Sequence, residues 1–310
     1  MSKKTSYLLG ILLTIIIGTL LYCYLCDTCH CFPNGEEAIA TEDTNNIEEP
    51  EVIKTTHNAL SISDANGDFN IKINDNFNFK TSNFSILEPL SADVTASVSK
   101  LKDYLLENPL KDIDITGYYR GDETNDSAYP NLGLARSNAV KNYLISQGVP
   151  AKQIDTRGKL NDAINPDDAS TLYGPLEFGI VTLKEGATDQ ALEAACDEIR
   201  KNPLILYFNT GQAQINLTAE QRQKIAQISK CVDKLGVKVQ AIGHTDGSGS
   251  AVTNMRLGQG RADFAKDYLV RNGILGSNIE ASSKGESEPI ASNATEAGKK
   301  QNRRTVITIN

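Results

Sequence analysis

The sequence predicts an α+β protein in which one β-α-β-α-β-β unit occurs twice in tandem, after a single N-terminal transmembrane helix. Three observations predict this fold class. Two stretches of about 40 residues repeat the same spaced residues, the second stretch alternates between strand and helix patterns, and an uncharged apolar run lies near the N-terminus. A chain of 310 residues is long enough for two ordinary domains.

The apolar run covers residues 7–25 and follows two lysines. About 20 apolar residues allow a helix to cross the hydrocarbon core of a bilayer. Lysines before such a helix favour a cytoplasmic N-terminus. We therefore expect a cytoplasmic segment at residues 1–6 and a transmembrane anchor at 7–25, with the rest of the chain in the periplasm. A bare apolar helix favours the inner membrane, because outer-membrane spans are usually barrels.

Two other fates of this segment remain open. A cleaved signal peptide usually has a shorter apolar region and a cleavage site of small residues, whereas bulky Tyr24 and Leu25 end this run. A lipid-modified cysteine is the second alternative, but the residues before the first two cysteines are Tyr and Leu instead of small ones.

Four cysteines form a cluster at the end of the apolar run and just after it: Cys23, Cys26, Cys29 and Cys31. Disulfides are the favoured interpretation of these cysteines and a metal site the weaker one, because no second group of ligands exists.

Residues 26–57 hold this cysteine cluster and a polar, acidic stretch with few residues that can fill a core. We expect a flexible linker there. Alternating apolar residues then flank Asn66-Gly67, which predicts a β-hairpin between about Leu60 and Ile73.

The internal repeat relates residues 115–154 to 241–279, with domains expected at 58–186 (the first copy) and 187–310 (the second copy). The matches comprise Gly117 with Gly243, Leu132–Arg136 with Leu257–Arg261, Tyr143-Leu144 with Tyr268-Leu269, and Gly148 with Gly273. At the ends of the copies, Phe79–Thr81 is aligned with Phe208–Thr210, and Phe178–Leu183 with Arg304–Ile309.

The second copy has the clearer element order. Its first helix is apolar at every third or fourth position, and it is expected to begin after Thr218 and to end at Gly236. The order of elements implies helices packed on a mixed sheet. The expected elements are strand 204–208, helix 218–234, strand 237–243, helix 253–272, strand 279–284 and strand 304–309.

The charge balance excludes one large class of partner. The chain has 31 Lys+Arg against 39 Asp+Glu, a net charge of -8. A general nucleic-acid binder needs a basic face that displaces counterions, so we expect no nucleic-acid partner. No residue pattern implies a cofactor.

A candidate ligand site lies after the middle strand of the second copy. Asp246 follows the end of this strand, and Arg261 lies 15 residues later on the next helix. A strand-loop-helix turn brings two such positions together. A carboxylate beside a guanidinium can hold a zwitterion, because the carboxylate binds an ammonium group and the guanidinium binds a carboxylate. The alternative is an ordinary turn followed by a solvated arginine.

The segments GHTDGSGS, LGQGRA and GESEPIASNATEAGKKQNRRTVI together resemble the OmpA-like, peptidoglycan-associated domain family over residues 204–310. The resemblance implies non-catalytic binding of meso-diaminopimelate in the peptidoglycan stem peptide. In this family, the positions of Asp246 and Arg261 bind its ammonium and carboxylate groups. Thr245, Asn254 and Arg304 match residues that line the same pocket.

The first copy keeps the scaffold and lacks the clamp. Arg120 stands at the place of Asp246, while Arg136 matches Arg261. Two arginines without a carboxylate repel an ammonium group. Asp122 replaces the carboxylate of Asp246 only if the loop of the first copy, which is one residue longer, places it correctly. We expect a degenerate copy that serves as a spacer or contacts protein.

The resemblance makes membrane-to-wall anchoring the leading hypothesis. The alternative is an envelope scaffold that assembles with itself or with another envelope protein, with wall binding secondary. Wall hydrolysis is disfavoured because no nucleophile, metal set or carboxylate pair is visible. Ion conduction, the role of the similar flagellar stator proteins, is disfavoured because residues 7–25 contain no ionisable side chain. Cys196 and Cys231 either form a disulfide or remain separate thiols.

Overall fold

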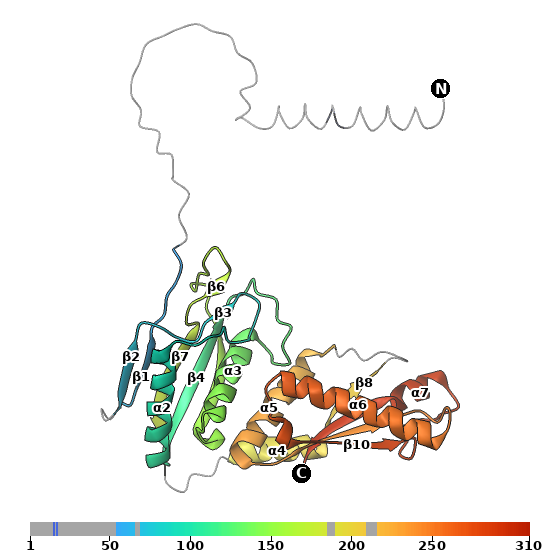
Figure 1. Cartoon of the computed structure of the whole chain (residues 1–310). Helices are drawn as coiled ribbons and strands as arrows, with labels where there is room; N and C mark the ends of the chain where they lie inside the picture. Colours follow the sequence, from blue (N-terminus) through green and yellow to red (C-terminus); the bar gives the residue numbers. More distant parts are fainter. Residues whose placement is uncertain (1–14, 16, 18–53, 66–68, 185–189, 209–215) are drawn as a thin grey trace. The chain divides into compact units, whose positions relative to one another are not determined.

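Figure 1 presents the chain as a computed structural model, which describes residues 15, 17, 54–65, 69–184, 190–208 and 216–310. The expected transmembrane anchor and cysteine cluster lie outside the described residues, apart from the helical positions Ile15 and Ile17. Among the described residues, no helix combines the length and apolar character that a membrane crossing requires. Residues Val52–Asn310 form one unit, which contains both copies.

The second copy has a four-stranded mixed sheet with the order β10-β9-β11-β8. Strands β9 and β10 are parallel, and β11 is antiparallel to both of its neighbours. Two helices, α5 and α6, connect the strands, so the predicted order of elements is confirmed. The elements are β8 (Leu204–Tyr207), α5 (Ala219–Leu235), β9 (Val239–His244), α6 (Ala251–Arg271), β10 (Ile279–Gly285) and β11 (Arg304–Ile309).

Local sequence signals set the ends of α5. The Thr218 hydroxyl accepts a hydrogen bond from the amide of Gln221, whose side chain bonds back to the Thr218 amide. This reciprocal cap satisfies two amides that the first helical turn leaves free. Gly236 ends the helix in the left-handed region at φ 68°, where glycine has no steric penalty. The predicted cap and terminator of this helix are both confirmed.

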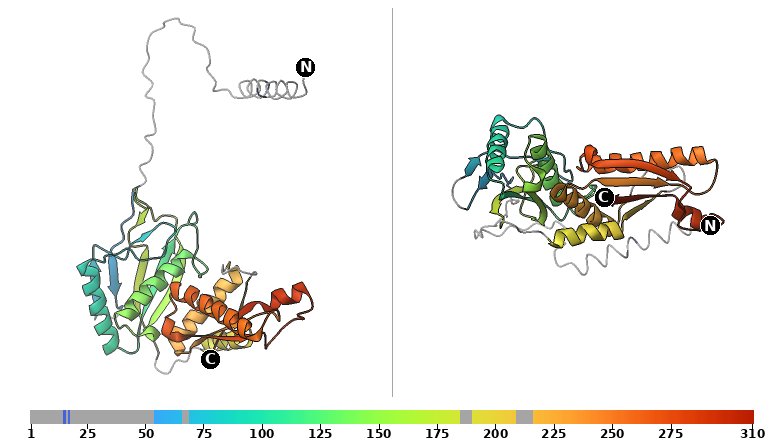
Figure 2. Two further views of the ribbon diagram at one scale, coloured as in Figure 1. Left: turned by 45° about the vertical axis from the view of Figure 1, so that its right-hand side comes forward. Right: turned by 90° about the horizontal axis from the view of Figure 1, so that it is seen from below.

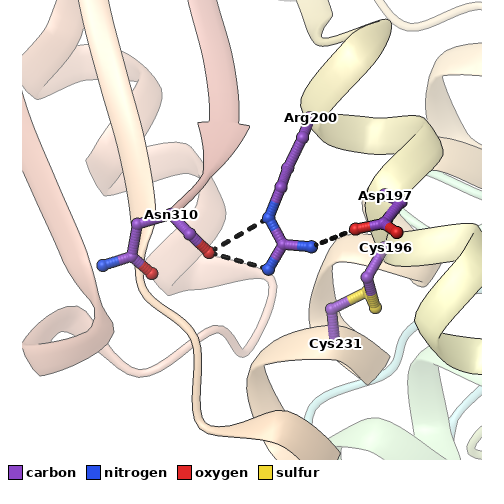
Figure 3. Close-up of a disulfide and its surroundings, with 5 residues drawn as sticks. All are labelled: Cys196, Asp197, Arg200, Cys231 and Asn310. Atoms are coloured by element: carbon purple, nitrogen blue, oxygen red, sulfur yellow. Dashed lines mark hydrogen bonds and ion pairs between the residues drawn. A yellow bond between two sulfur atoms is a disulfide. The ribbon is translucent and has the colours of Figure 1, made fainter.

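Two further helices complete the second copy. Helix α4 (Gln190–Lys201) precedes β8, and the short α7 (Glu296–Asn302) lies in the segment expected to be a loop. A disulfide joins Cys196 of α4 to Cys231 of α5 (Figure 3), and both residues are fully buried in the apolar core. Thr295 caps α7 by accepting a hydrogen bond from the amide of Gly298.

The first copy has a three-stranded sheet, β5-β4-β7, with helices α2 and α3 packed against it (Figures 1 and 2). Strand β3, in the segment aligned with Phe208–Thr210, pairs with β6 in a separate small sheet. The predicted hairpin is present as β1 and β2, and Asp64 after β1 bridges to β7. The bounds are β1 (Leu60–Ser63), β2 (Asn70–Ile73), β3 (Phe79–Lys80), α2 (Ala92–Glu107), β4 (Lys111–Tyr119), α3 (Leu132–Ser146), β5 (Ile154–Leu160), β6 (Thr171–Leu172) and β7 (Leu176–Thr182).

The sheet register corrects one alignment between the copies. Gly117 of β4 pairs with Leu176, whereas the equivalent Gly243 of β9 pairs with Thr305. Leu176 is therefore equivalent to Thr305, and the expected alignment of Phe178–Leu183 with Arg304–Ile309 is wrong by three residues. It follows that Gly174 and Pro175 stand at the places of Arg303 and Arg304.

Ion pairs connect the two copies. Lys234 of α5 lies 2.8 Å from carboxylate oxygens of both Asp112 and Asp155 in the first copy. Lys141 of α3 is buried and lies 2.5 Å from Asp233 of α5. Because Asp112 and Lys141 are each only 2% exposed, these charges depend on partners from the other copy.

Candidate functional site

Two glycines allow helix α6 to lie directly on strand β9. A Cβ atom on Gly243 would lie 1.9 Å from the carbonyl oxygen of Gly258, which is closer than any real contact. A Cβ atom on Gly258 would lie 2.2 Å from the hydroxyl of Ser283. The absence of side chains at both positions therefore brings the first half of α6 against the end of β9.

Arg261 lies three residues after Gly258, on the same part of α6. Its Nη1 donates a 2.7 Å hydrogen bond to the carbonyl oxygen of His244, the last residue of β9. This bond directs the guanidinium towards the loop that follows the strand. The predicted partner position, Asp246, is the second residue of that loop.

The carboxylate of Asp246 is bound by a different arginine. Nη1 of Arg303 donates to Oδ2 of Asp246 at 2.7 Å, and each of the two side chains is 14% exposed. The other carboxylate oxygen accepts the amide of Ser248 at 3.0 Å, which fixes the start of the loop. Two guanidinium groups, those of Arg261 and Arg303, therefore converge on the loop that carries the Asp246 carboxylate.

The pKa values reflect this arrangement. Burial raises the pKa of Asp246, but the hydrogen bonds from Arg303 and Ser248 outweigh it, so the pKa lies below its ordinary value. Burial lowers the pKa of Arg261; the charge of Asp246 opposes this effect, and the charge of Arg303 adds to it. Asp246 is therefore an anion at neutral pH, and Arg261 lies within electrostatic reach of both other groups.

Arg304 has a different environment from its neighbour. It is 4% exposed, and its Nη2 donates to the carbonyl oxygen of Glu288 at 3.0 Å. Beside it, burial and the Arg304 charge lower the pKa of His244 to about 4, so this imidazole is neutral at neutral pH. The structure thus places Arg304 against the backbone of the loop before α7, and Arg303 against Asp246.

Two further predicted residues lie at the same end of the sheet, where β10 ends. Thr245 is buried, its amide donates to the carbonyl oxygen of Gly285, and its hydroxyl has no partner among the described residues. Asn254 of α6 is 1% exposed and donates a short hydrogen bond to the carboxylate of Glu286. Gly285 has a φ of 51° at a bulge in β10, which places Glu286 beside the start of α6.

A buried amide holds the two sides of the site together. Asn302 is fully buried, accepts the amides of Ile290 and Ala291, and donates to the side-chain oxygen of Asn293. That same Asn293 oxygen accepts the amide of Gly247, next to Asp246. Asn302 also directly precedes Arg303. The network therefore ties both partners of the Asp246–Arg303 ion pair to one rigid group.

The equivalent place in the first copy is filled by its own side chains. Arg136, equivalent to Arg261, forms an ion pair with Glu123 in which both side chains are completely buried. Arg120 binds both oxygens of Asp122, at 2.9 and 3.0 Å. Asp122, which was a replacement for Asp246 only if the longer loop allowed it, is thus paired with Arg120, while Glu123 occupies the carboxylate-binding face of Arg136.

The sequence reasoning missed two residues, Arg303 and Glu123. Arg303 is in the Asn-Arg-Arg stretch, but nothing in the sequence says which of the two arginines faces Asp246. No group of three or more metal-binding side chains occurs among the described residues. The cysteine cluster considered for a metal lies outside them.

A family model described as the OmpA family matches residues 78–171 and 207–303, one region in each copy. Outer membrane porin F of Pseudomonas fluorescens is 46% identical over 71 residues, which are 23% of this chain and 22% of that protein. Peptidoglycan-binding protein ArfA of Mycobacterium tuberculosis is 35% identical over 120 residues, 38% of this chain and 36% of that protein. The chain thus spans well under half the length of these two relatives.

A shorter relative is covered more fully. The peptidoglycan-associated lipoprotein of Buchnera aphidicola is 33% identical over 149 residues, which are 46% of this chain and 82% of that protein. Among solved structures, the peptidoglycan-associated lipoprotein from Burkholderia pseudomallei has 26% identity and a TM-score of 0.29, covering 34% of this chain and 89% of that one.

Proposed function

Since the chain belongs to the OmpA family, we propose that it is a non-catalytic tether that binds peptidoglycan through the meso-diaminopimelate of the stem peptide. The observation that carries this proposal is the convergence of Arg261 and Arg303 on the Asp246 loop in the second copy. The family that the sequence motifs resemble is the same family whose model matches residues 78–171 and 207–303.

The chemistry of the site suits a zwitterion. The carboxylate of Asp246 can accept an ammonium group, and the guanidinium groups beside it can donate to a carboxylate. The free end of diaminopimelate carries both groups on one carbon atom. Thr245, Asn254 and Arg304 are proposed to line this site, with Arg304 acting through the backbone that it holds.

The cell envelope is the location that this function requires. We propose that residues 7–25 anchor the chain in a membrane, that residues 26–57 form the linker, and that the copies at 58–186 and 187–310 lie in the periplasm. The relatives support an envelope location, since one is a porin of the outer membrane and another a peptidoglycan-associated lipoprotein.

The first copy is proposed to be a spacer or docking module. Its Arg136 already has a buried carboxylate partner, so a ligand carboxylate would have to displace Glu123. Its ion pairs with α5 favour a role in holding the second copy. The scaffold alternative, in which the chain contacts itself or another envelope protein, rests on this same observation.

The proposal is tested by titrating the full-length protein with a diaminopimelate-containing stem peptide and by pulldown with isolated cell wall. Asp246→Ala and Arg261→Ala are each expected to abolish binding while the protein stays folded. Arg256→Ala, at an exposed position of α6, is the matched charge control and should bind normally. Normal binding by both site variants would refute the tether and leave the scaffold alternative.

A further inference from the structure

Resting on the proposed function, we infer that Arg303 is a specificity-determining residue that makes the site select stem peptides with a free diaminopimelate carboxylate and reject those with a carboxamide there. The inference begins from the charges at the site. A simple clamp for a zwitterion needs one anion and one cation, whereas this site has a second cation.

The charges that face the site do not cancel. Lys284 and Glu288 pair with each other at 3.1 Å and contribute no net charge. His244 is neutral at neutral pH. The remaining groups, three guanidinium cations and two carboxylate anions, leave one positive charge in excess: Arg261, Arg303 and Arg304 against Asp246 and Glu286.

Arg303 is placed to contribute to ligand binding. One of its terminal nitrogens holds Asp246, while its Nε is buried without a partner among the described residues. A guanidinium has five donors in a planar fork, so it can bind Asp246 with one edge and offer the other to a second carboxylate. Because Asn302 is fixed by its buried hydrogen bonds, the backbone that carries Arg303 is also fixed.

A zwitterion fits these groups in one orientation. Its ammonium group binds Asp246, and the carboxylate on the same carbon atom then lies beside the guanidinium bound to Asp246. Arg261, which bonds to the His244 carbonyl oxygen just before the same loop, is the second donor. Two guanidinium groups therefore share one ligand carboxylate. The zwitterion is neutral overall, so it adds no charge to the positive excess of the site.

A carboxamide changes both the charge and the hydrogen bonding. The ligand becomes a cation in a site that already has a positive excess. The carboxamide NH2 would also face guanidinium donors with no acceptor between them, which leaves buried donors unpaired. We expect the carboxamide to bind at least about 100-fold more weakly than the acid, because sites built for a polar group strongly reject analogues without it.

The test is a calorimetric titration of the full-length protein and its Arg303→Gln variant with two synthetic peptides. Both are the tripeptide of alanine, γ-linked glutamate and diaminopimelate, with the free-end carboxyl as the acid or as the carboxamide. The wild type should bind the acid and discriminate at least about 100-fold, whereas Arg303→Gln should bind the acid more weakly and lose about tenfold of the discrimination. Arg303→Lys, which keeps the charge without the fork, should lie between them, and Arg256→Gln should match the wild type.

Three results would overturn the inference. Equal binding of acid and carboxamide by the wild type would show that the site does not recognise the carboxylate charge. Tighter binding of the acid by Arg303→Gln would show that Arg303 only competes with the ligand for Asp246. Failure of the wild type to bind either peptide would refute the proposed function itself, and the inference with it.

Discussion

Arg136 and Glu123 form a completely buried ion pair in the first copy, at the place where the second copy leaves Arg261 bonded to a backbone carbonyl. Nη1 of Arg136 donates to Oε2 of Glu123 at 3.0 Å, and the same carboxylate accepts the amides of Ser82 and Arg120, both at 2.8 Å. The first copy thus supplies from its own loop the carboxylate that the second copy is proposed to take from a ligand.

Removal of Glu123 should strongly destabilise the protein. Glu123→Ala leaves the Arg136 guanidinium buried without its counter-charge, which typically costs about 3–5 kcal/mol. The free energy of unfolding in urea measures this loss. Asp122→Ala is the matched control, because its side chain is 65% exposed and surface pairs contribute about 0–1 kcal/mol. Equal effects of the two variants would contradict the buried pair.

Gly258→Ala should weaken both stability and ligand binding. The new Cβ would lie 2.2 Å from the Ser283 hydroxyl and 2.9 Å from the Gly243 carbonyl oxygen, so α6 must move and carry Arg261 with it. Overpacking of this kind costs about 1–3 kcal/mol. Gly260→Ala, on the same helix with no atom within 4 Å of the new Cβ, should instead stabilise by about 0.5–1 kcal/mol. Thermal unfolding and stem-peptide titration of the two variants measure these effects. A stability change of the same sign in both variants would contradict the prediction.

His244 should make stability depend on pH in the mildly acidic range. Its pKa is lowered from 6.5 to about 4 in the folded protein, mainly by burial, so the unfolded chain binds more protons between these values. Stability therefore falls as the pH drops from about 6.5 to 4, by up to about 3 kcal/mol. Urea unfolding at pH 6.5 and 4.5 measures the loss, and His244→Asn should reduce the difference between the two. An unchanged difference in the variant would assign it to other groups.

Lys234→Met should loosen the contact between the copies. The substitution leaves Asp112, which is 2% exposed, without its only recorded cation among the described residues, and the expected loss is about 3–5 kcal/mol. Burial already raises the pKa of Asp112, and Lys234 opposes this effect, so removal of Lys234 should raise that pKa further. Calorimetric unfolding measures the effect. Lys230→Met is the control, because that side chain is 51% exposed and lies 3.5 Å from Asp155; a loss as large as that of Lys234→Met would argue against the buried contact.

Much of the second copy could be predicted because its signals are local and periodic. Thr218 and Gly236 end α5 through contacts within a few residues of themselves, so the sequence contains all the information that the ends need. The glycine pair Gly117 and Gly243 identifies the repeat because both positions lie under a helix and exclude any side chain.

The wrong alignment at the end of the first copy concerns a strand whose register is set by pairing with residues far away in the sequence. The end of the first copy was aligned three residues away from its true partner, because apolar alternation in β7 fits several registers and only pairing with β4 selects one. An odd shift also exchanges the two faces of a strand. Helix α7 was missed because seven residues give too little periodicity for recognition.

One physical reason explains why sequence patterns do not identify Arg303 and Glu123: the roles of both depend on long-range contacts. Arg303 and Arg304 are adjacent, so both fit the motif, and only the position of β11 beside β9 and β8 decides which one reaches Asp246. Glu123 lies in an irregular loop without periodicity. Its role depends on the fold bringing that loop over Arg136, thirteen residues later.

The disulfide between α4 and α5 determines how the second copy would respond to a mechanical pull. The chain enters this copy through α4, whose Arg200 also donates to the carbonyl oxygen of Asn310 (Figure 3). A helix held only by apolar contacts and one arginine peels away turn by turn under tension. The Cys196–Cys231 bond, which closes 35 residues of chain, instead passes the load covalently into α5, next to its ion pairs with the first copy. In a tether between membrane and wall, strain from turgor would thus unwind only the residues of α4 that precede Cys196, and would then reach the folded body through the covalent bond.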